Sequence, residues 1–194
     1  MDYKGFSKKE LMDILYVVQA ASVCETEADM VKIIHKAREL VCADYCICGI
    51  EGKTGDGLSP VLQIVNGNYP EEWLNIYLAE KFFKIDPVIR HHLKFGMTQV
   101  WSDTFKFYND KASGDFLNCA ADFGLKHGIS SGVFDPEEKN ISIFSFASNT
   151  SRNGFKSHSK KIVDILIPHL HKSLARSRKM AGLAINQHVL LKNR

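Results

Sequence analysis

Hydrophobic residues recur at helical spacing near both ends of the chain, on stripes of positions three and four residues apart. Ser7-Lys8-Lys9-Glu10 is the pattern of a capping box, and the apolar stripe behind it predicts a helix to about Ser22. Thr26 begins a second helix of similar length. A third stripe predicts a long helix from about Phe155, which Pro168 should kink because it removes one backbone hydrogen bond.

The middle of the chain contains short apolar runs that are typical of strands. Two hairpins are predicted, Tyr45–Ile50 with Pro60–Val65 and Ser130–Asp135 with Ile141–Ser148. Gly96–Val100 predicts a short edge strand. Apolar residues lie on both faces of the last long strand, so both faces of the sheet should be covered.

Two further helices are predicted between the hairpins, over Tyr69 to about Ile85 and over Lys111–Lys126, the second ending in a glycine cap at Gly128. Ser102–Asp110 is predicted to be a loop. This order predicts an α+β fold: an α-β-α sandwich with a central antiparallel sheet of about five strands, in the style of GAF and PAS domains.

The helix near Tyr69 concentrates aromatic side chains on one face. Tyr69, Trp73 and Tyr77 are spaced four residues apart, and Asp86, which precedes Pro87, is expected to turn the chain where the helix ends. Such stripes usually pack into a core. The alternative is a pocket for an apolar ligand with an amide-like head, since ligand sites are apolar with a few placed polar groups. The spacing alone favours core packing and leaves both interpretations open.

The same residues belong to a longer pattern, Tyr69-x3-Trp73-x3-Tyr77-x8-Asp86-Pro87-x13-Trp101. This pattern resembles the autoinducer-binding domain of LuxR-type quorum-sensing transcription regulators, and His127–Val133 is similar to that family's G-x-x-x-G-V segment. The resemblance covers roughly residues 7 to 180. We therefore expect an autoinducer-binding domain over residues 1–180 and a linker or tail over residues 181–194.

The resemblance implies a ligand, an N-acyl homoserine lactone, and a role for each polar residue around its head. Trp73 would donate its indole N–H to the lactone carbonyl, and Tyr69 would donate to the amide carbonyl. Asp86 would accept the amide N–H. These roles match the donors and acceptors that the side chains carry, and no further cofactor is expected.

The remaining residues of the implied site lie around the ring and the acyl chain. Trp101 would pack beside the lactone ring, Tyr77 would line the acyl side, and Ser145 would help to hold the head group or a 3-oxo oxygen. Leu74 departs from those family members that carry an arginine here to reach a 3-oxo oxygen, so a preference for 3-oxo ligands is not implied.

The chain departs from the family after Met180, where nothing resembles the motif that opens the helix-turn-helix domain of these regulators. The main hypothesis is the sensor domain of a transcription regulator, acting as a homodimer and reaching DNA only through a helix-turn-helix domain absent from this chain. The alternative is a stand-alone sensor or decoy that dimerises with a full-length regulator.

Composition narrows the class of protein. Hydrophobic residues make up 45% of the chain without a run long enough to span a membrane, and the N-terminus lacks an apolar signal region, so a cytoplasmic protein is expected. Charge is uneven: residues 151–194 carry ten Lys or Arg and one acid. This basic end indicates either phosphate contact or a solvated helix face.

Catalytic and metal sites are not predicted. His91 and His92 are adjacent rather than one helical turn apart, and no G-x-S-x-G motif occurs, so an enzyme is not expected. Among the five cysteines, Cys42, Cys46 and Cys48 are close together, but no second pair follows at zinc-site spacing. We expect them to be buried structural thiols.

Overall fold

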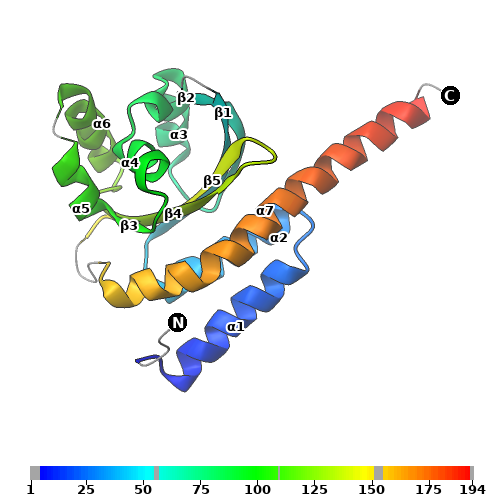
Figure 1. Ribbon diagram of the computed structural model, residues 1–194, viewed down its shortest axis with the longest axis horizontal. Coiled ribbons are helices and arrows are strands. Elements are labelled where there is room, and N and C mark those ends of the chain that lie inside the picture. The colour runs from blue at the N-terminus through cyan, green and yellow to red at the C-terminus, as the bar shows by residue number, and fades with distance from the viewer. Residues whose placement is uncertain (1–4, 55–56, 109, 151–154, 193–194) are drawn as a thin grey trace.

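The computed structural model describes residues 5–54, 57–108, 110–150 and 155–192. At its centre, five antiparallel strands form one sheet in the order β2-β1-β5-β4-β3, with helices on both faces (Figure 1). From β1 to β5 the strands span Tyr45–Thr54, Gly57–Asn66, Gln99–Val100, His127–Asp135 and Asn140–Ser148. The predicted α-β-α sandwich is confirmed.

One face of the sheet is covered by helices α2 and α7, and α1 packs against these two helices (Figure 1). Helices α1, α2 and α7 span Lys8–Ser22, Glu27–Leu40 and Ser157–Lys192. Both predicted N-termini are confirmed, since Ser7 and Thr26 each form a capping box. Alternate residues of β1 and β5 point to these helices, among them Cys46, Cys48 and Phe144, all of which are buried. Each large apolar side chain buried here contributes about 1.5–3 kcal/mol to folding.

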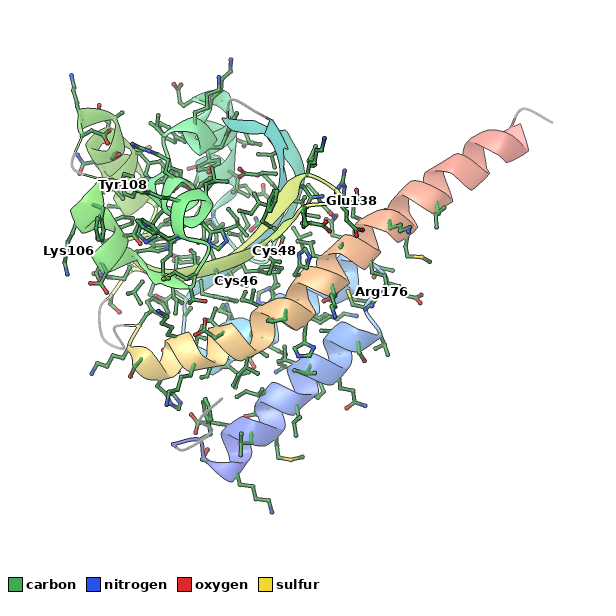
Figure 2. All side chains as sticks on the ribbon, viewed as in Figure 1. Cys46, Cys48, Lys106, Tyr108, Glu138 and Arg176 are labelled. Carbon is green, nitrogen blue, oxygen red and sulfur yellow. The ribbon has the colours of Figure 1, made fainter. Side chains whose placement is uncertain are left out.

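The long helix α7 continues through Pro168 and across position 180, so it does not end at the predicted boundary of the domain. Its C-terminal part extends beyond the sheet (Figure 1). Arg176 of α7 fixes the neighbouring helix, because its guanidinium donates to the carbonyl oxygens of Ala21 and Cys24, each at 2.6 Å (Figure 2). Ala21 lies in the last turn of α1, where the helix leaves its carbonyls without partners, and Cys24 follows the C-cap residue.

The opposite face of the sheet is covered by helices α3, α4, α5 and α6 and two short 3-10 segments. The helices span Glu71–Ala79, Pro87–Phe95, Trp101–Thr104 and Lys111–Asp122, and the 3-10 segments span Phe82–Lys84 and Phe105–Phe107. A second apolar cluster lies between this layer and the sheet, with Trp73, Trp101 and Phe116 among its buried members.

The predicted helix from Tyr69 to Ile85 is wrong in its second half. α3 ends at Ala79, and Lys81 adopts a left-handed backbone conformation (φ 55°) before the chain continues in the 3-10 segment. This break folds Phe82 back onto Trp73, with ring centroids 5.9 Å apart. Contacts between aromatic rings therefore end the helix where local propensity would have continued it.

Asp86 begins a helix rather than closing one. Its carboxylate accepts the backbone N–H of Val88 at 2.7 Å and caps α4, with Pro87 in the first turn. The prediction of a loop over Ser102–Asp110 is also wrong in part, since α5 and a 3-10 segment occupy residues 101–107.

The predicted end of the helix at Lys126 is too late, and the residue assigned to its cap is wrong. α6 ends at Asp122, and Gly124, not Gly128, has the positive φ (81°). Gly128 instead lies in β4 beneath the Trp101 indole, where a Cβ atom would overlap the ring. Close packing of Trp101 thus explains why a glycine stands at position 128.

Candidate ligand pocket

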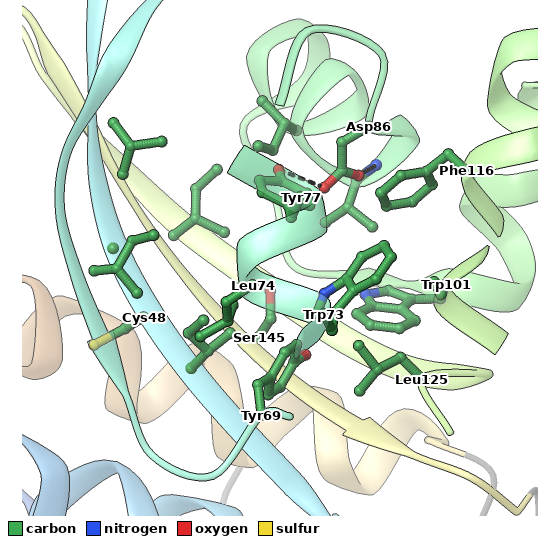
Figure 3. Close-up of a pocket in the computed structure, with 18 of the residues that line it drawn as sticks. Cys48, Tyr69, Trp73, Leu74, Tyr77, Asp86, Trp101, Phe116, Leu125 and Ser145 are labelled. Carbon is green, nitrogen blue, oxygen red and sulfur yellow. Dashed lines mark hydrogen bonds between the residues drawn. The ribbon is translucent and has the colours of Figure 1, made fainter. Parts of the chain in front are cut away.

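A cavity of about 110 Å³ lies between the sheet and the helices α3 to α6 (Figure 3). Its wall is mostly apolar. All six residues proposed from the sequence line it: Tyr69, Trp73, Tyr77, Asp86, Trp101 and Ser145. The structure therefore brings together residues that are up to 76 positions apart in the chain (145 minus 69).

Asp86 is the most strongly constrained polar group of the cavity. Its Oδ2 atom accepts the Tyr77 hydroxyl at 3.0 Å, and its other oxygen accepts the α4 backbone (Figure 3). Burial raises the pKa of Asp86 to about 6, against the opposing effect of the hydrogen bonds from Val88 and Tyr77. At neutral pH the carboxylate is ionised and can accept a further donor from the cavity.

The break at Lys81 creates this arrangement. Tyr77 and Asp86 are nine residues apart, so in one continuous helix their Cα atoms would be separated by roughly 13 Å along the axis. With α3 ended and the chain turned, the phenol and the carboxylate are in direct contact. Asp86 therefore faces the cavity from the start of α4, opposite the aromatic face of α3.

Trp101 and Ser145 are joined by a second hydrogen-bonded chain. The Trp101 indole donates to the Ser130 hydroxyl at 2.8 Å, and the hydroxyls of Ser130 and Ser145 are 2.8 Å apart. The indole N–H is thus occupied, which agrees with a packing role for Trp101 rather than a donor role. Ser130 was not proposed from the sequence, and it connects the two predicted residues across strands β4 and β5.

Tyr69 and Trp73 form the aromatic wall of the cavity. The side chain of Asn66 holds the backbone of Tyr69 at both its N–H and its C=O. Among the described residues, the buried Tyr69 hydroxyl has no hydrogen-bond partner, so it is a donor available to a ligand. Trp73 packs against four rings, those of Tyr77, Phe82, Phe116 and Phe123.

One residue of the wall, Glu51, was not predicted from the sequence. It is only 7% exposed and lines the cavity, and burial, followed by the charge of Asp86, raises its pKa to about 8. The predicted strand stopped at Ile50, whereas β1 continues to Thr54. Because side chains alternate along a strand, extending it would have placed Glu51 on the face of Ile47 and Gly49.

The cysteines differ in their exposure. No group of three metal-ligating side chains occurs in the part of the chain that the structure describes. Cys46 and Cys48 are buried, and burial raises the pKa of Cys46 to about 12. Cys42 is exposed, which corrects the expectation that all three would be buried: it follows α2 in a left-handed conformation (φ 56°).

Comparisons with known proteins identify the family. Residues 26–174 match the family model described as the autoinducer binding domain. The chain belongs to this family, the signal-binding domain of LuxR-type regulators, and this supports a ligand-sensing role in quorum sensing. No helix among the described residues has the length and apolarity to cross a membrane.

This chain matches only part of the length of its curated relatives. The quorum-sensing regulator RpaR of Rhodopseudomonas palustris is 35% identical over 43% of this chain and 34% of its own. The transcriptional activator AnoR of Acinetobacter nosocomialis is 25% identical over 58% of this chain and 45% of its own. The matched segments thus span about a third to a half of these regulators.

Solved structures share the fold. CepR2 of Burkholderia cenocepacia, described as an N-acylhomoserine lactone dependent LuxR family factor, has a TM-score of 0.68 at 20% identity, covering 91% of this chain and 99% of its own. A complex of SdiA with octanoyl-rac-glycerol has a TM-score of 0.67 at 20% identity, covering 91% of this chain and 68% of that one.

Proposed function

We propose that this chain senses an N-acyl homoserine lactone in the cavity between the sheet and α3, as the signal-binding part of a transcription regulator. The observation that carries the proposal is the Tyr77–Asp86 pair, which presents a buried carboxylate to an apolar cavity. A hydrocarbon ligand would leave that carboxylate without a donor on the cavity side, whereas the amide N–H of an acylated lactone supplies one. The apolar wall suits an acyl chain, at roughly 0.8 kcal/mol per buried CH₂.

Three further polar groups of the wall can also pair with such a ligand. The free hydroxyl of Tyr69 can donate to the amide carbonyl, and the Trp73 indole N–H to the lactone carbonyl. Ser145 offers a hydroxyl on the sheet side. The name of CepR2 states dependence on this class of ligand, and the curated relatives are transcriptional regulators, which supports the same assignment.

Control of transcription, homodimer formation and a cytoplasmic location belong to the same proposal. The curated relatives are regulators about two to three times as long as their matched segments. Under this proposal, residues 1–180 bind the signal and the remainder of α7 leads out of the sensing domain, so that DNA is reached only through a helix-turn-helix domain.

The test is a substitution that separates ligand contact from folding. Asp86→Asn keeps a cap for α4, since Asn caps helices about as well as Asp, but it removes the charged acceptor for the ligand amide. We expect affinity for N-octanoyl homoserine lactone to fall about ten- to a hundredfold, which corresponds to about 1.5–3 kcal/mol for a hydrogen bond to a charged group. Isothermal titration calorimetry measures this directly.

Asp110→Asn is the matched control, because Asp110 caps α6 outside the cavity. It should leave the affinity unchanged. Equal affinities of wild type and Asp86→Asn would reject the contact with Asp86. If wild type bound no acyl homoserine lactone of any chain length, the assignment of the ligand class would be wrong.

A further inference from the structure

Glu51 is a buried carboxyl group in the wall of the cavity. It is 7% exposed, and its Oε2 atom has no hydrogen-bond partner among the described residues. Buried polar groups are normally hydrogen-bonded, because an unsatisfied one destabilises the fold. A residue kept in this state at a cavity wall indicates a partner that arrives with the ligand.

The backbone of the sheet directs Glu51 toward the cavity. The register between β1 and β2 shifts at this point, since Ile50 pairs with Gln63 whereas Glu51 pairs with Val61. Such irregularities re-aim side chains next to functional sites. On the other side, Glu51 pairs with Ile141 of β5 in regular register, so its position in the sheet is fixed from both neighbours.

The protonation state defines what Glu51 can bind. Burial raises its pKa to about 8, and the negative charge of Asp86 acts in the same direction. Tyr69 and Tyr77, which also line the cavity, are held neutral because burial raises the pKa of each far above the usual range. At neutral pH Glu51 is therefore a carboxylic acid, which both donates and accepts a hydrogen bond.

Glu51 is separated from Ser145 along the sheet. Ile47 pairs with Ser145, and Glu51 lies four residues further along β1, about 13 Å away at the rise of a strand. Between the Ile47–Ser145 pair and Glu51, the wall is formed by Gly49 and Ile143. Neither residue offers a polar side chain. Ser145 and Glu51 therefore contact different parts of any ligand that fills the cavity.

We infer that Glu51 selects signals whose acyl chain carries a hydroxyl group. A hydroxyl matches the carboxylic acid in both directions, because it can accept from the acid O–H and donate to the acid C=O. A ketone can only accept from the acid O–H, and an unsubstituted acyl chain pairs with neither the O–H nor the C=O of the acid. The inference rests on the proposed function, since it assumes that the lactone head is held by Asp86 and that the chain extends toward Glu51.

The experiment compares plain and hydroxylated ligands on wild type, two variants of Glu51 and one control variant. N-octanoyl homoserine lactone is titrated alongside analogues hydroxylated at the third or at the terminal carbon of the chain. Wild type should bind one hydroxylated analogue about tenfold or more tightly than the plain ligand, as expected for a satisfied buried pair. Glu51→Gln keeps a donor and an acceptor and should retain this preference.

Glu51→Leu should reverse the preference, because the hydroxyl would then be buried against an apolar side chain. Ile143→Val is the matched control in the same wall and should keep the wild-type preference. Melting temperatures without ligand show that each variant folds. The preference is a ratio of two affinities measured on the same variant, so a change in the stability of Glu51→Leu does not affect how it is read.

The outcomes separate this inference from the proposed function. If wild type binds the plain ligand as tightly as every hydroxylated one, or if Glu51→Leu keeps the preference, the role of Glu51 is wrong and lactone sensing stands. If no homoserine lactone binds wild type, the proposed function is rejected and the inference falls with it.

Discussion

Asp86 and Glu51 show how the surroundings of a residue decide its chemistry. Both are buried acids in one cavity, but Asp86 accepts two hydrogen bonds from the protein, whereas Glu51 Oε2 accepts none among the described residues. Hydrogen bonds favour the charged form, so the pKa of Asp86 rises only to about 6 and that of Glu51 rises to about 8. At neutral pH one acid is an acceptor and the other is also a donor.

These shifts predict how stability depends on pH. Between the ordinary Glu value of 4.5 and about 8, the folded protein keeps a proton on Glu51 that the unfolded chain has lost. Stability should therefore fall as pH rises through this window and level off above it, with Asp86 contributing between 3.8 and about 6. Without ligand, urea unfolding should give a free energy that is a few kcal/mol lower at pH 8.5 than at pH 5.5.

Glu51→Gln cannot titrate and should remove the larger part of that difference. Glu72→Gln, on the exposed face of α3, is the control and should leave the difference as in wild type. A pH dependence that is the same in wild type and Glu51→Gln would show that Glu51 is already ionised in the folded protein.

At the scale of elements, the break between α3 and the 3-10 segment Phe82–Lys84 forms one side of the cavity. Lys81 has the left-handed conformation (φ 55°, ψ 40°) that favours glycine. The exposed lysine side chain does not account for this conformation. Two tertiary contacts impose it: the packing of Phe82 against the aromatic rings, and the hydrogen bond between Tyr77 and Asp86.

Lys81→Gly should therefore stabilise the protein. A left-handed conformation costs a non-glycine residue roughly 1–2 kcal/mol, and part of this is offset because glycine loses more backbone entropy on folding. We expect a gain of up to about 1 kcal/mol in chemical unfolding. Lys84→Gly, in the 3-10 segment, is the control and should destabilise the protein; a loss of stability in Lys81→Gly as well would mean that the side chain of Lys81 supports the break.

At the scale of the whole molecule, the two faces of the sheet are packed differently. The cluster beneath α1, α2 and α7 is larger than the one beneath α3 to α6, which surrounds the cavity. The cavity of about 110 Å³ is also smaller than the roughly 300–1,000 Å³ of typical ligand sites. We infer that the layer from α3 to α6 moves outward to admit an acylated ligand.

Hydrogen exchange followed by mass spectrometry tests this inference. Without ligand, amides of α3, α4 and α6 should exchange faster than those of α1, α2 and the described part of α7, because fewer buried contacts hold them. Saturation with N-octanoyl homoserine lactone should slow exchange chiefly in the α3 to α6 layer, since the ligand stabilises the state that binds it. Equal protection of both layers before and after binding would contradict a movable layer.

Local patterns predicted much of this fold correctly. The capping boxes at Ser7 and Thr26 and both hairpins follow from interactions between residues close in sequence. The short edge strand was also predicted, although its Gln99 pairs with the distant Ser130 of β4.

Two of the places where prediction failed, the break at Lys81 and the start of α4 at Asp86, lie beside the aromatic rings of Phe82 and Tyr77. An Asp-Pro pair can close a helix in a turn or begin a new helix. The prediction took Asp86 as a turn, whereas it begins α4.

Regular spacing was sufficient for the layers of the sandwich, because it dictates which face of a helix or strand a side chain occupies. The resemblance of the longer sequence pattern to a known family identified the six residues of the cavity wall. The contact of Asp86 with Tyr77, the link from Trp101 through Ser130 to Ser145, and the burial of Glu51 emerged solely from the folded structure. Each of these depends on a chain reversal or on the pairing of strands, and such contacts between distant residues leave no periodic signal in the sequence.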